Sequence, residues 1–283
     1  PGRAQTYPVS AAFFLLRPNT SPSPPNVAVP SPLNAATSSP DTDAVNNGGH
    51  EVRVLSRHGG AVGPAPRSTP FAVDLRSGIG LDRAVAGAGV IVHCASGVTG
   101  GDLEATGTLI RAAQRAGVPH LVYISIVGVD RIDYGYYRTK LAAERAIEES
   151  GLLWSLLRTT QFHDLILMAC RTLARLPVMP VPARTSFQPL DASEVAARLV
   201  EIALGAPAGR VPVMGGPEMR TAEDLAHAYL RASGRHRRVF PVRLPGAALA
   251  GFRRGDHLAP GAAVGRITFE QFLQTRLGPD PGR

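Results

Sequence analysis

Short runs of apolar and β-branched residues alternate with longer stretches of helical character from Glu51 onward. These runs are almost continuously apolar, which is typical of strands that are covered on both faces of a sheet. The alternation of such strands with helices predicts βαβ units, and therefore an α/β fold with a Rossmann-like, doubly wound parallel sheet. We expect strands at residues 52–56, 71–73, 90–93, 121–125 and 154–159.

Helices are expected between and after these strands. Asp102 is in a position to cap a helix that ends at Gly117. By analogy with other doubly wound sheets, residues 49–283 are expected to form one domain in which the less regular region 163–283 is a small C-terminal substrate lobe. The remaining elements expected are helices over residues 137–149, 193–204 and 221–232, the last with a capping box, and a strand over residues 210–214.

Residues 1–48 differ from the rest of the chain, because they carry nine prolines, many Ser, Thr and Asn residues and only two acidic residues. Such a segment buries too little apolar surface to offset the entropy of ordering, so we expect it to be disordered or irregular. A Rossmann domain begins with a strand, a glycine-rich turn and a helix whose N-terminus faces the cofactor phosphates. No glycine lies between Gly2 and Gly48, and prolines interrupt every candidate strand or helix. We therefore expect the first strand and the glycine-rich loop to be absent.

Other glycines do not supply the missing loop. Gly59 and Gly60 follow an expected strand, but Pro64 and Pro66 prevent the start of a helix there. Two explanations of the N-terminal segment stay open. One is a reading-frame or start-site error upstream of Gly49, and the other is a natural chain that has lost tight cofactor binding.

Composition limits the class of protein. No apolar run is long enough to span a membrane, and the apolar stretch 9–16 lacks the cleavage site of a secretory signal. Cys94 and Cys170 have no metal-ligand spacing and fit reduced thiols of a cytoplasmic protein. The net charge of +8 includes a basic cluster at residues 235–238, which we interpret as solvated surface, although nucleic-acid binding with steep salt dependence stays open. We expect a small-molecule substrate and no metal, nucleic-acid or membrane partner.

The strongest chemical pattern is Ser125 at the end of an expected strand, followed by Tyr136 and Lys140 in the next helix. Residues four apart share one face of a helix, so the ammonium of Lys140, the only lysine in the chain, can lie beside the Tyr136 phenol. A positive charge there favours the phenolate and suits the tyrosine to proton transfer. Ser125 would face the crevice at the carboxyl ends of the strands. The alternatives are a chance pairing on a solvated helix face, or a role for Tyr134 or Tyr137 instead.

Six short motifs follow one another along the chain. They are GHEVRVLSR at residues 49–57, DL at 74–75, VIVHCAS at 90–96, YISIVG at 123–128, YYRTK at 136–140 and RTTQF at 158–162. In their order and spacing, residues 50–277 resemble the atypical short-chain dehydrogenase/reductases, and among them the NmrA-like NAD(P)H-binding proteins.

The resemblance implies a dinucleotide site, position by position. Ser56 and Arg57 would receive the 2′-phosphate of NADP, to which a guanidinium is suited, although Arg57 as an ordinary exposed residue is the alternative. Lys140 would also bind the nicotinamide ribose. The other residues implied are Asp74 and Leu75 beside the adenine, Cys94, Ala95 and Ser96 beneath the nicotinamide ribose, and Thr159, Thr160 and Phe162 closing the nicotinamide side.

We therefore expect an NAD(P)H-dependent oxidoreductase that prefers NADP to NAD. Hydride would move between the nicotinamide and a carbonyl or quinone-like substrate, while Tyr136 exchanges the proton and Ser125 orients the oxygen. The missing glycine-rich loop predicts that this activity is impaired. The alternative is a non-catalytic, NmrA-like dinucleotide sensor or a pseudoenzyme.

Overall fold

The computed structural model describes residues 13–17, 51–57, 68–94, 101–243 and 245–278. The chain forms two compact units. The chain passes between them several times, so neither unit is one continuous stretch of sequence. The first consists of Pro1–Tyr123, Ala142–Leu156 and Ala196–Gly209, and the second of Ile124–Leu141, Leu157–Val195 and Arg210–Arg283.

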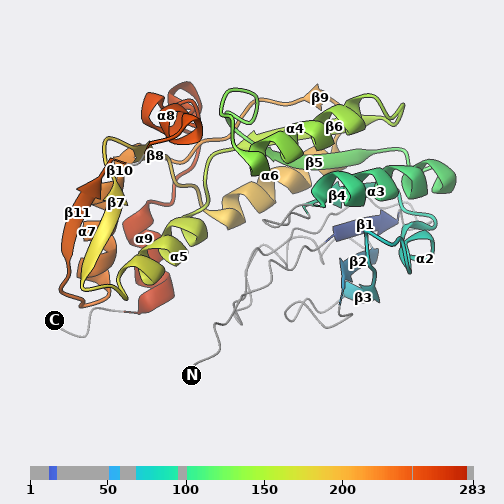
Figure 1. Cartoon of the computed structure of the whole chain (residues 1–283). Helices are drawn as coiled ribbons and strands as arrows, with labels where there is room; N and C mark the ends of the chain where they lie inside the picture. The colour runs from blue at the N-terminus through green and yellow to red at the C-terminus, as the bar shows by residue number, and fades with distance from the viewer. Residues whose placement is uncertain (1–12, 18–50, 58–67, 95–100, 244, 279–283) are drawn as a thin grey trace. The chain divides into compact units, whose positions relative to one another are not determined.

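A seven-stranded sheet is the framework of the first unit, in the order β3-β2-β1-β4-β5-β6-β9 (Figure 1). β2 is parallel to β3, and β4 is parallel to β5. This sheet, with its helices, confirms the predicted Rossmann-like α/β fold, although only Arg210 of the strand expected over residues 210–214 lies in β9. The strands are β1 (Phe13–Arg17), β2 (Glu51–Ser56), β3 (Ser68–Ala72), β4 (Val90–His93), β5 (Leu121–Ile126), β6 (Trp154–Thr159) and β9 (Gly209–Arg210).

The central strand β1 comes from the segment in which no strand was expected. It lies between β2 and β4, with Leu15 opposite Arg53 on one side and Ile91 on the other. The expectation that no strand forms in this segment is therefore wrong for Phe13–Arg17, and the rest of residues 1–48 lies outside the described residues. The physical reason is that four consecutive apolar residues begin β1, and Pro18 follows the strand instead of interrupting it.

The direction of β1 differs from that of a Rossmann first strand, because β1 is antiparallel to both β2 and β4. Its last residue, Arg17, pairs with Glu51, the first residue of β2. The chain therefore leaves β1 at the amino-terminal edge of the neighbouring strands. Cofactor phosphates bind at the opposite, carboxyl edge of such sheets, so β1 does not lead into a phosphate-binding turn there.

Helices pack against one face of this sheet. Alternate residues of β5, Leu121 and Tyr123, are buried in one core with Leu109 of α3 and Ile147 of α4. α3 ends at Gly117 as predicted, but Asp102 is its first residue and Gly101 is its cap. The helices that run through or into this unit are α2 (Leu81–Val85), α3 (Asp102–Ala116), α4 (Gly135–Glu148) and α6 (Ala192–Leu204).

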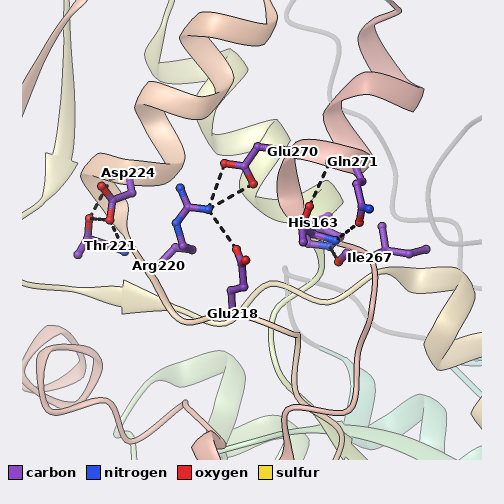
Figure 2. Close-up of polar contacts among 9 residues, drawn as sticks. His163, Glu218, Arg220, Thr221, Asp224, Ile267, Glu270 and Gln271 are labelled. Atoms are coloured by element: carbon purple, nitrogen blue, oxygen red, sulfur yellow. Dashed lines mark hydrogen bonds and ion pairs between the residues drawn. The ribbon is translucent and has the colours of Figure 1, made fainter.

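The second unit combines helices with two short sheets, a parallel pair of β7 and β11 and an antiparallel pair of β8 and β10. The predicted capping box is confirmed, because the Thr221 hydroxyl accepts a hydrogen bond from the Asp224 main-chain N–H at 3.1 Å (Figure 2). Arg220 joins Glu218 to Glu270, whose two carboxylate oxygens lie 3.1 and 3.2 Å from Nη1. The elements are α5 (His163–Leu173), β7 (Val178–Pro182), β8 (Ser186–Phe187), β10 (Arg220–Thr221), α7 (Ala222–Ala232), β11 (Arg238–Val242), α8 (Ala247–Arg254) and α9 (Phe269–Leu277).

The central position of β1 predicts a large effect of proline within it. Leu15→Pro removes a main-chain donor from a strand that is paired on both sides, and we expect it to lower the free energy of unfolding by about 3 kcal/mol. Leu15→Val keeps the N–H group and is the control. Urea denaturation of both variants measures the difference, and equal stability of the two would contradict the pairing of β1 at this place.

Candidate active site

Ser125 lies at the fifth position of β5, in the part of the strand that belongs to the second unit. Its side chain is 2% exposed, and its hydroxyl has no hydrogen-bond partner among the described residues. Buried polar groups ordinarily have a partner, and leaving one unsatisfied costs about 1–3 kcal/mol. This hydroxyl is therefore suited to a hydrogen bond with a bound ligand.

Lys140 meets the end of the same strand. Its side chain is 3% exposed, and its Nζ donates a hydrogen bond to the main-chain oxygen of Ile124 at 3.1 Å. A buried ammonium group needs such partners because it has left the solvent. Since Ile124 directly precedes Ser125, the structure brings the lysine and the serine of the predicted pattern to one point of the second unit.

Three tyrosines cluster at the start of α4, and their environments differ. Tyr137 is buried against Phe252, with ring centroids 5.9 Å apart, and this burial raises its pKa. Tyr134 precedes the helix and is 44% exposed. Tyr136 is half-buried and lies one helical turn before Lys140. Burial thus disfavours the phenolate of Tyr137, whereas Tyr136, the tyrosine of the predicted pattern, is less buried.

The residues expected beside the adenine and its ribose phosphate lie in the first unit. Ser56 ends β2, and Arg57 follows it and is exposed. The main-chain N–H of Arg76 and the Ser77 hydroxyl each lie 3.0 Å from the Asp74 carboxylate, and together with the Arg57 charge they hold the pKa of Asp74 below its usual value. The Asp74 carboxylate is therefore used to organise its own turn.

The other predicted cofactor residues are divided between the units. In the first unit, Leu75 packs against the core and Cys94 directly follows β4, whereas Ala95 and Ser96 lie outside the described residues. In the second unit, Thr159 ends β6 and Phe162 precedes α5.

Thr160 has a structural role that was not expected from the sequence, because its hydroxyl bonds two main-chain groups. Its hydroxyl donates to the Gln188 main-chain oxygen at 2.6 Å and accepts from the Gly216 main-chain N–H at 3.1 Å. Gly216 has no room for a side chain, because a Cβ would lie 1.8 Å from the Pro189 oxygen. Thr160 thus joins the end of β6 to two loops of the second unit.

Three buried polar side chains of the second unit were not predicted from the sequence, namely Gln161, Gln188 and His257. The side-chain NH₂ of Gln188 donates to Gly216 and Ala259. Gln161 donates to the main-chain oxygen of His257, while its own side-chain oxygen has no partner among the residues described. Neutral amides carry no motif, so no signal in the sequence could have identified them.

The His257 side chain is fully buried and has one hydrogen bond to the described residues. Its Nε2 lies 2.8 Å from the main-chain oxygen of Ser186, and because a carbonyl only accepts, Nε2 carries the proton. Nδ1 has no partner within the described part of the chain. Burial therefore lowers the pKa of His257 to about 4.

Residues 42–166 match a family model described as NAD(P)H-binding. No curated protein matches the chain in sequence. The family match agrees with the sheet order and with the predicted likeness to the atypical short-chain dehydrogenase/reductases.

Solved structures of epimerases and reductases share the fold. A nucleoside-diphosphate-sugar epimerase from Staphylococcus aureus has a TM-score of 0.61 at 16% identity, over 75% of this chain and 85% of that chain. An NADPH-dependent quinone oxidoreductase from Escherichia coli has a TM-score of 0.60 at 16% identity, over 74% and 83%. A triphenylmethane reductase from Citrobacter has a TM-score of 0.59 at 17% identity, over 72% and 81%. The chain thus shares the Rossmann-like fold of these epimerases and reductases.

The described residues contain neither a helix that could span a membrane nor a cluster of metal ligands. None of the helices there has the length and apolar character to cross a membrane. No group of three or more His, Cys, Asp or Glu side chains in those ranges could hold a metal ion.

The buried His257 predicts a loss of stability in acid. Its folded-state pKa of about 4 lies below the 6.5 of an exposed histidine, so the unfolded chain takes up the proton first as the pH falls. Its contribution is complete above pH 6.5 and is lost towards pH 4, by about 3 kcal/mol in total. His257→Gln keeps an N–H donor and cannot titrate. Urea denaturation between these pH values should give a shallower pH dependence for the variant, and identical slopes would contradict the assignment.

Proposed function

We propose that the protein is an NAD(P)H-dependent oxidoreductase of the atypical short-chain type, acting on a carbonyl or quinone-like small molecule. The observation that carries the proposal is the buried hydroxyl of Ser125, which has no partner among the described residues. It follows directly after Ile124, whose main-chain oxygen accepts a hydrogen bond from Lys140. Tyr136 lies one turn of α4 before Lys140. Structural neighbours with reductase activity in their names, from Escherichia coli and Citrobacter, support this class of reaction.

The residues of the second unit fit the nicotinamide end of such a cofactor. The Ser125 hydroxyl is buried without a partner among the described residues, and the Lys140 ammonium is bound to the residue that precedes Ser125. When bound, a reduced nicotinamide supplies a hydride to the substrate carbon. Tyr136 then gives its phenolic proton to the substrate oxygen, and Ser125 donates a hydrogen bond that orients this oxygen. Lys140 stabilises the phenolate that is left and contacts the ribose.

At the other end of the cofactor, Arg57 and Ser56 would receive the 2′-phosphate, so that NADP is preferred to NAD. Asp74 and Leu75 would border the adenine. Since the Asp74 carboxylate is held by Arg76 and Ser77, its main-chain atoms are the groups left for a ligand. Cys94, Ala95 and Ser96 would lie beneath the nicotinamide ribose, and Thr159, Thr160 and Phe162 would close the nicotinamide side.

Cofactor affinity is weak in this proposal, because the direction of β1 gives the pyrophosphate no turn of main-chain N–H groups after this strand. The same observation favours the second candidate, a non-catalytic NmrA-like dinucleotide sensor or pseudoenzyme. Turnover separates the two functions, since both bind the dinucleotide.

Replacement of the catalytic phenol gives the test of the enzyme. Tyr136→Phe should lower NADPH-dependent turnover of a simple quinone by about 10²–10⁴-fold while the dissociation constant for NADPH stays the same. Tyr134→Phe, which removes the exposed neighbouring hydroxyl, is the matched control. Steady-state kinetics and nicotinamide fluorescence measure the two quantities. Binding without turnover in the unaltered chain would favour the sensor, and equal losses in both variants would refute the role of Tyr136.

The role of Arg57 predicts a change in cofactor preference. Arg57→Ala removes a charge-assisted contact with the 2′-phosphate, so the dissociation constant for NADPH should rise about tenfold or more. NADH lacks this phosphate, and its dissociation constant should not change. A parallel fluorescence titration with both nucleotides measures the effect, and an equal rise for both would show that Arg57 does not recognise the phosphate.

A further inference from the structure

Two segments of the second unit, residues 171–184 and 231–243, together carry eight arginines and no acidic residue. The structure brings them together. Arg237 Nε donates to the main-chain oxygen of Ala174 at the end of α5, at 3.3 Å. Shortly after this contact the two segments continue into β7 and β11, which pair in parallel from Val178 and Arg238 onward. Charge that is spread over the sequence is therefore concentrated on one part of the surface.

The sheet of β7 and β11 is covered on one face only. α7 packs against both strands (Figure 1), and Met179 and Val181 are buried in the core that it shares. Alternate residues point the other way, where Val178 is 46% and Phe240 is 56% exposed. Parallel strands are ordinarily covered on both faces, so this exposed apolar face requires a partner that the described part of the chain does not provide.

Exposed arginines lie in, or shortly before, the two strands that carry these apolar residues. Arg175, Arg235 and Arg238 are exposed, and none of them forms an ion pair with any residue in the described ranges. Arg238 is the register partner of Val178, and Arg175 lies shortly before that strand. Unneutralised positive charge and exposed apolar side chains thus occupy the same surface. We call this surface the basic apolar face and define it by Arg175, Leu176, Val178, Arg235, Arg238 and Phe240.

We propose that the basic apolar face docks the protein onto an anionic lipid surface. A lipid headgroup region accepts both kinds of side chain, since phosphates attract the arginines and the acyl boundary takes up Phe240, Val178 and Leu176. A nucleic acid would neutralise the arginines but would leave the aliphatic side chains in water. Docking of this kind needs no membrane-spanning helix. It departs from the expectation, made from the sequence, that the protein has no membrane partner. The proposal does not depend on the oxidoreductase function.

Co-sedimentation of the full chain with vesicles tests this docking. We expect saturable binding to vesicles of phosphatidylcholine with phosphatidylglycerol, and much weaker binding to phosphatidylcholine alone. Removing two arginines by Arg235→Gln with Arg238→Gln should weaken binding about twenty-fivefold, at about fivefold for each residue. The matched control is Arg111→Gln with Arg145→Gln, which removes the same charge from two exposed arginines of α3 and α4 and should change binding by less than about twofold.

The apolar half of the face has its own variant. Phe240→Ser should weaken vesicle binding about tenfold, and this loss should persist at high salt because it is not electrostatic. Equal effects of the two double variants would overturn the proposal, as would the absence of saturable binding. Tighter binding to a short DNA duplex, unchanged by Phe240→Ser, would also overturn it and would assign the face to nucleic acid.

Discussion

The facing edges of β2 and β4 impose the constraint on which the first unit depends. Each edge carries main-chain N–H and C=O groups that must be paired when they are buried, and only another strand can pair both edges at once. β1 does so by pairing five residues with β2 and four with β4. Antiparallel pairing satisfies these groups at least as well as parallel pairing. The stability of the sheet therefore requires a strand at this place but does not fix the direction in which it runs.

The chemistry of a dinucleotide site does depend on that direction. A parallel first strand ends at the carboxyl edge of the sheet, where the turn that follows can present its N–H groups to the pyrophosphate. In the proposed function, a cofactor would be held by side chains such as Arg57 and by residues near Ser125, because β1 ends at the other edge of the sheet. Contacts made by exposed charges are screened by salt. The strand reversal would therefore make the affinity of the proposed site depend on ionic strength.

Hydrophobic pattern and capping residues were sufficient to predict most of the regular elements, because these signals are local. β4 and β6 have their predicted bounds, and Gly117 and the Thr221 capping box mark helix ends where they were expected. β1 was not predictable in the same way, since its short apolar run shows no alternation and its pairing partners are distant in sequence. In the site, the spacing of Ser125, Tyr136 and Lys140 was visible in the sequence. The contacts of Gln161, Gln188 and Thr160 were not, because they are set by main-chain groups that long-range folding brings close.

Lys140 shows why one basic residue of this chain differs from the others. All 29 other basic residues are arginine, and Lys140 alone combines a buried position with a hydrogen bond from a compact ammonium group to one carbonyl oxygen. A guanidinium has five donors in a rigid plane, whereas an ammonium is a compact group with three donors. Lysine and its hydrogen bond to Ile124 fit the role proposed for this position, next to Ser125, whose hydroxyl has no partner among the described residues.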